Sequence, residues 1–104
     1  MTDYTLDDGF ERKIINVKSI DSARIKAITM AKTHKWGISV IIYKGIRWDT
    51  YEDKIKARVG TVHLIVGIGG YSELRWYAYR NGRKGNQYRL NKDGSLGKIL
   101  PKEI

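Results

Sequence analysis

Apolar side chains recur every three or four positions over residues 22–35, a spacing that predicts an α-helix with one buried face. The residues of this face are Ile20, Ala23, Ala27, Ile28, Met30, Ala31 and His34. Ser19 or Asp21 can cap the helix, because either side-chain oxygen accepts a free N–H group of the first turn. Gly37 then offers the left-handed residue that commonly ends a helix.

After the helix, apolar and polar residues alternate with the period of two that is typical of β-strands. The expected strands cover residues 38–43, 59–68, 74–80, 88–90 and 96–100, and a short strand over 14–17 can precede the helix. Turn signals separate the later strands, at Gly69-Gly70, Asn81-Gly82 and Lys92-Asp93-Gly94. Residues 72–81 also fit helical spacing, but Trp and Tyr residues between glycine turns favour a strand.

These elements predict an α+β fold, with one N-terminal α-helix packed on an antiparallel β-meander of four to five strands. The length of 104 residues suits one ordinary domain. Residues 1–12 are acidic and polar, a composition typical of a flexible tail. We therefore expect a flexible acidic tail over 1–12 and a single α+β domain over 13–104.

The composition excludes several classes of site. The chain has no cysteine, so it can hold neither a disulfide nor a thiolate metal site. Its start lacks the basic and then apolar pattern of a secretory signal, and its longest apolar run, residues 40–43, is far too short to span a membrane. We expect a cytoplasmic protein with no cofactor, no metal and no membrane partner.

The net charge of +9 bears on the partner, because such a field attracts polyanions and speeds their encounter with the protein. Nucleic acid, whether DNA or RNA, is the commonest intracellular polyanion, although an acidic protein would be attracted in the same way. The charge therefore favours a nucleic-acid-binding module without catalysis.

The segment 74–92 carries the strongest local signal, because basic and aromatic residues are interleaved there without any acidic residue. Guanidinium groups bind phosphate in a bidentate way, and aromatic rings stack on bases. As a strand, the segment places Arg75, Tyr77 and Tyr79 on one face. The candidate nucleic-acid-binding residues of this basic hairpin are Arg75, Tyr77, Tyr79, Arg80, Arg83, Lys84, Tyr88, Arg89 and Lys92.

A second basic cluster, formed by Arg47, Lys56 and Arg58, completes the candidate interface. Read as two short strands across a turn, the residues 45–48 and 56–58 resemble the start of an AP2-type three-stranded DNA-binding sheet. That resemblance implies a sheet that reads the major groove. It covers about fifteen residues and does not extend to the Leu-Gly step or the following helix of that family, so the chain is not assigned to it.

Two other function classes remain open. In a small protein-interaction or inhibitor module, of the phage or mobile-element type, Trp36, Trp48 and Trp76 would be exposed anchors, since tryptophan dominates binding hot spots. An edge strand could also pair with its own copy and form a homodimer. In a small metal-independent ribonuclease, His63 would act as acid or base.

Overall fold

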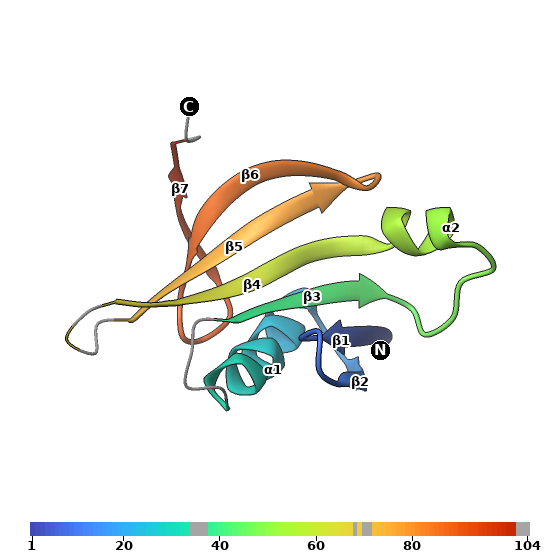
Figure 1. Cartoon of the computed structure of the whole chain (residues 1–104), viewed down its shortest axis with the longest axis horizontal. Coiled ribbons are helices and arrows are strands. Elements are labelled where there is room, and N and C mark those ends of the chain that lie inside the picture. The colour runs from blue at the N-terminus through green and yellow to red at the C-terminus, as the bar shows by residue number, and fades with distance from the viewer. Residues whose placement is uncertain (34–37, 68, 70–71, 102–104) are drawn as a thin grey trace.

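The computed structural model describes residues 1–33, 38–67, 69 and 72–101, and its strands form one seven-stranded antiparallel sheet. The strands are β1 (Thr2–Asp7), β2 (Arg12–Val17), β3 (Ile38–Lys44), β4 (Arg58–Val66), β5 (Ser72–Arg80), β6 (Arg83–Leu90) and β7 (Leu96–Leu100). Their order in the sheet is β2-β1-β3-β4-β5-β6-β7, so β2 and β7 form its edges. Helix α1 (Ile20–Lys32) packs on one face, and helix α2 (Tyr51–Lys56) lies beside the β5–β6 turn (Figure 1).

Helix α1 follows the predicted pattern. The backbone N–H of Ser22 donates to the side-chain oxygen of Ser19, which caps the helix. The helix begins at Ile20, two residues before the expected start, and ends at Lys32, three residues before the expected end. Ala23, Ala27 and Ala31 are fully buried, and their small side chains let the helix backbone approach the sheet closely. His34 and Gly37, which were expected to end the helix, lie outside the described residues.

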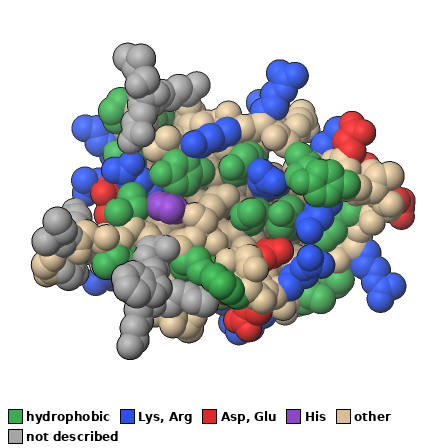
Figure 2. Space-filling view, in the orientation of Figure 1, with side chains coloured by type: hydrophobic (Ala, Val, Ile, Leu, Met, Phe, Trp, Pro, Cys, Tyr) green, Lys and Arg blue, Asp and Glu red, His purple; other side chains and the backbone are tan. Residues whose placement is uncertain are grey.

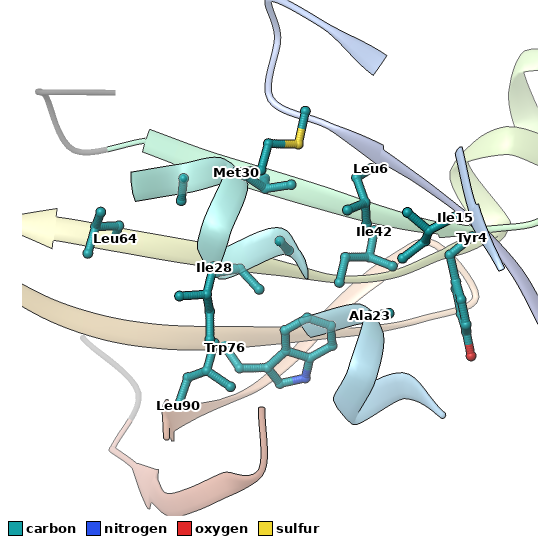
Figure 3. Close-up of a cluster of buried hydrophobic side chains, with 14 of the residues drawn as sticks. Tyr4, Leu6, Ile15, Ala23, Ile28, Met30, Ile42, Leu64, Trp76 and Leu90 are labelled. Carbon is teal, nitrogen blue, oxygen red and sulfur yellow. The ribbon is translucent and has the colours of Figure 1, made fainter. Parts of the chain in front are cut away.

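Trp76 is the largest fully buried side chain and fills the space between α1 and the sheet. Figure 3 shows its indole among apolar side chains from both layers. The guanidinium of Arg24 lies 4.5 Å from the centre of this ring and donates to Asp21 and to the backbone oxygen of Gly94. Arg24 thus links the helix to the β6–β7 turn across the core.

The N-terminal residues form a β-hairpin instead of the flexible tail that was expected over residues 1–12. Strand β1 lies inside the sheet, between β2 and β3, and Leu6 is completely buried. The carboxylate of Asp8 accepts the N–H groups of Phe10 and Glu11, which shapes the β1–β2 turn. This hairpin raises the sheet to seven strands, so the predicted α+β class is confirmed whereas the count of four to five strands is wrong.

The segment 72–81 resolves as a strand followed by a tight turn. Strand β5 ends at Arg80, and Asn81 and Gly82 both have positive φ angles, of 52° and 80°. Two successive positive φ angles are typical of the type I′ turn that joins hairpin strands. The helical alternative for this segment is therefore wrong.

The segment after β3 differs from the prediction. Residues 51–56 form α2, whose N-cap Thr50 accepts the N–H of Asp53, and Lys56 pairs with Glu52 at 3.3 Å. Arg47 lies in the preceding loop, so the expected pair of short strands is wrong and the AP2-type resemblance fails with it. Neither helix in the described part of the chain has the length and apolar character needed to cross a membrane.

Candidate functional site

The face of the sheet opposite α1, here called the open face, carries the candidate site. The side chains of β3 and β4 that point toward α1 include the fully buried Val40, Ile42 and Val62. Because successive side chains of a strand point to opposite faces, the residues next to these three point away from α1. This alternation places Arg75, Tyr77 and Tyr79 on the open face, so the prediction that the three share one face is confirmed. In Figure 2, green and blue side chains lie around the purple histidine of this face.

Strand pairing arranges the open face in three rows that run across the strands. The tyrosine row contains Tyr43, Arg58, Tyr79 and Lys84. The middle row contains Ile41, Thr61, Tyr77 and Gln87. The histidine row contains Ser39, His63, Arg75 and Arg89. Along β3 and β5, adjacent rows are two residues apart, a separation of about 6.7 Å.

Two irregularities bring cations into the tyrosine row. The β3–β4 register passes from Ile42–Gly60 to Tyr43–Arg58, and the extra residue, Val59, lets the Arg58 side chain join the open face. A similar shift between β5 and β6 places Lys84 opposite Tyr79. Without these shifts, strict alternation would send both cations to the other face.

The cations at the tyrosine row stack on tyrosine rings. The charged groups of Lys54, Arg58 and Lys84 lie 5.2, 4.9 and 4.7 Å from the ring centres of Tyr43, Tyr79 and Tyr77, respectively. No ion pair between described residues includes any of these three cations. A tyrosine ring positions a cation without cancelling its charge, whereas a carboxylate would cancel it. The tyrosine row therefore retains its attraction for anions.

The histidine row is electrostatically different. The Nε and Nη2 groups of Arg75 donate to the carboxylate of Glu73 at 3.0 and 3.3 Å, so this cation is neutralised. The same hydrogen bonds lower the pKa of Glu73, because they favour its charged form. Arg89 lies opposite Arg75 in the neighbouring strand and is exposed. Within this row, Arg89 is thus the cation that is better placed to meet a ligand.

His63 is held in place by two contacts. Its Nδ1 atom shares a hydrogen bond of 2.5 Å with the Ser39 hydroxyl, and its ring meets Tyr77 edge to face at 5.9 Å. Partial burial lowers the pKa of His63, and the nearby charge of Arg75 lowers that pKa further. The imidazole is therefore neutral at physiological pH, with one nitrogen able to donate and the other able to accept.

This pKa shift makes stability depend on pH. The unfolded chain protonates His63 near the ordinary pKa of 6.5, whereas the folded chain does so only at lower pH. We therefore expect the free energy of unfolding to fall as pH is lowered from about 7.5 to about 5.5. Urea unfolding across this range measures the effect. His63→Asn should flatten the fall, and an unchanged fall in His63→Asn would contradict the assignment.

Two hollows lie along these rows. A shallow pocket of about 240 Å³ is lined by Ser39, Thr61, His63, Tyr77, Tyr79 and Lys84. A second hollow, of about 480 Å³, is lined by Arg80, Asn81, Arg83, Lys84 and Gly85 at the β5–β6 turn. Lys84 contributes to both, so the basic hairpin turn continues the tyrosine row.

The structure brings some predicted binding residues together and separates others. Arg58, Arg75, Tyr77, Tyr79, Lys84 and Arg89 share the open face. Tyr88 instead lies opposite Trp76 on the α1 side, where it packs against the core. Lys92 lies in the β6–β7 turn, beside a different hollow of about 280 Å³. The exposed Arg47 and the ion-paired Lys56 belong to the loop and helix after β3.

The two tryptophans in the described part of the chain, Trp48 and Trp76, do not form an exposed surface. Trp76 is only 2% exposed, so its assignment as an anchor is wrong. Trp48 stacks on Tyr43, with ring centres 5.4 Å apart, and its indole N–H donates to the Lys44 carbonyl. Trp36 lies outside the described residues.

Several residues of the open face were not among the predicted binding residues. All of them lie outside the basic hairpin. At the tyrosine row they are Tyr43 and Lys54, which stacks on it, and in the pocket they are Ser39 and Thr61. Alternation within residues 38–43 indicates that Ser39 and Tyr43 share a face, yet only the β3–β4 register places them beside His63 and Arg58.

The open face thus combines cations that keep their charge with aromatic rings and neutral hydrogen-bonding groups. Such a surface can bind phosphates electrostatically and contact planar, polar groups beside them. The chain matches no protein-family model, no curated protein and no solved structure, so this site is interpreted from its geometry.

Proposed function

We propose that the protein is a nucleic-acid-binding module without catalysis and that the open face is its binding surface. The observation that carries this proposal is the placement of Lys54, Arg58 and Lys84 on tyrosine rings. Three uncancelled cations in one row suit the regularly spaced charges of a phosphate backbone better than they suit one small anion. The net charge of +9 supports the same conclusion, because it draws polyanions to the molecule.

Removing two of these cations should weaken binding to any nucleic acid. We expect Lys54→Ala/Lys84→Ala to lose about tenfold in affinity at low salt, because phosphate contacts supply most of the sequence-independent binding free energy. Fluorescence anisotropy with labelled DNA and RNA oligonucleotides measures the loss.

The matched control is Lys18→Ala/Lys26→Ala, which removes the same charge from exposed lysines just before and within α1. If the two double variants bind equally well, net charge alone attracts the ligand and the open face is not its binding surface. If the unmodified protein binds neither DNA nor RNA, the proposed function is wrong.

One observation also favours a second candidate function, a metal-independent ribonuclease. His63 shares its pocket with Lys84 and a hydroxyl group of Ser39, so an acid–base group lies beside a cation that could hold a phosphate. Incubation of labelled RNA with the protein and a metal chelator separates the two candidates. Binding without catalysis leaves the RNA intact, whereas cleavage that disappears in His63→Ala would establish the ribonuclease.

A further inference from the structure

We propose that the nucleic acid bound by the open face is single-stranded and that one of its bases occupies the pocket beside His63 and Tyr77. This inference rests on the proposed function. It adds the strandedness of the ligand and a contact to a base, neither of which follows from the charge of the surface.

The separation of charge on the open face supports a single strand lying across the strands of the sheet. The three uncancelled cations stack on tyrosine rings, whereas the middle row between β3 and β6 consists of the uncharged side chains Ile41, Thr61, Tyr77 and Gln87. Two charges border this row: the Lys84 ammonium lies 4.7 Å from the Tyr77 ring centre, and Asp7 of β1 pairs with Ile41. Along β3 and β5, the tyrosine row and the middle row are about 6.7 Å apart. A backbone that follows the tyrosine row can therefore turn its bases toward Thr61, Tyr77 and Gln87 while its phosphates stay beside the cations, with the Lys84 ammonium moving from the Tyr77 ring to a phosphate.

The pocket has the size and chemistry for a base. Its volume of about 240 Å³ is smaller than the sites that hold drug-sized ligands, which begin at about 300 Å³, so a single planar ring system suits it. Two hydroxyl groups, from Ser39 and Thr61, and the neutral imidazole of His63 can each donate or accept a hydrogen bond. The edges of bases present both donors and acceptors, and the Tyr77 ring can stack on a base once the Lys84 ammonium, which lies 4.7 Å from its centre, moves to a phosphate.

The width of the open face argues against a duplex as the preferred ligand. Strands β3, β4, β5 and β6 carry the three rows and span about 14 Å, because neighbouring strands are about 4.8 Å apart. The major groove of DNA is about 12 Å wide and admits a helix or a two-stranded ribbon, so this four-stranded surface does not enter it. In a duplex, moreover, the faces of the bases are stacked on one another and cannot meet Tyr77.

The first test uses the unmodified protein and three ligands, whose affinities are compared at equal phosphate concentration. These are an oligonucleotide of about ten nucleotides, a duplex of the same sequence and inorganic polyphosphate, which has no bases. We expect the single strand to bind at least about tenfold more tightly than either of the others. Equal affinity for all three would overturn the inference while leaving the proposed function intact, because the surface would then recognise charge alone.

The second test isolates the base contact with Tyr77→Ala and, as the matched control, Tyr51→Ala on the exposed end of α2. Stacking on an aromatic ring typically accounts for a five-fold to hundred-fold change, so we expect Tyr77→Ala to weaken single-strand binding by about fivefold or more. Its affinity for polyphosphate should fall much less, because Lys84 loses the ring on which it stacks but keeps its charge. An equal loss for both ligands, or no loss for either, would overturn the inference. If no nucleic acid binds even the unmodified protein, the proposed function fails as well.

Discussion

Replacing Gly60 by alanine is expected to destabilise the protein by about 3 kcal/mol, near the upper end of the usual cost of overpacking a core. A Cβ atom on Gly60 would lie 2.2 Å from the Trp76 indole, far inside any van der Waals contact. Because Trp76 is enclosed by α1 and the sheet, the ring cannot withdraw without disturbing both layers. Urea unfolding measures the loss.

Gly85→Ala is the matched control for this substitution, since Gly85 also lies in a strand and an added Cβ would approach its nearest neighbour no closer than 3.4 Å. We expect Gly85→Ala to change the stability far less than Gly60→Ala. Trp76→Phe should recover part of the stability lost in Gly60→Ala, because a smaller ring leaves room for the added methyl group. A simple sum of the two single effects in the double variant would contradict the proposed clash.

The affinity for nucleic acid is expected to fall about 20- to 40-fold when the salt concentration is raised from about 50 mM to about 200 mM. Each phosphate contact contributes about 0.7 to the slope of log affinity against log salt for a single strand and about 0.9 for a duplex. Three contacts, from Lys54, Arg58 and Lys84, therefore give a slope between about −2 and −3. Anisotropy titrations at several salt concentrations measure it.

The double variant Lys54→Ala/Lys84→Ala should reduce this slope by about 1.5, because two of the three contacts are lost. Lys18→Ala/Lys26→Ala should leave the slope close to that of the unmodified protein. A slope near zero in the unmodified protein would show that the cations of the tyrosine row do not contact phosphate, whatever else the open face binds.

Local patterns in the sequence predicted the elements whose signals are contained within a few residues. The three-and-four spacing of Ala23, Ala27 and Ala31 located α1, and the dipeptide Asn81-Gly82 located a hairpin turn. Alternation also assigned Tyr77 and Tyr79 to one face of β5. Such predictions succeed because helical and strand periodicities act on neighbouring residues, whatever the rest of the fold.

The same patterns gave wrong predictions for several residues that have a structural role. Strand β1 carries Asp3 and Asp7 on its open face, so its composition is typical of a tail even though Leu6 is fully buried. Arg75 was predicted to bind nucleic acid, but Glu73, two residues earlier on the same strand, pairs with it. Trp76 was predicted as a possible anchor because no local signal distinguishes a buried tryptophan from an exposed one.

By itself, the sequence determined the α+β class, the presence and buried face of α1, the basic charge and the shared face of Arg75, Tyr77 and Tyr79. Only the tertiary structure decided which residues from other strands meet them. The β3–β4 register brings Ser39 beside His63. The register shift at Val59 brings Arg58 to the Tyr79 ring, and the shift in the β5–β6 hairpin brings Lys84 to the Tyr77 ring. The physical reason is that a register shift of one residue moves a side chain to the opposite face, and that shift depends on contacts between distant segments.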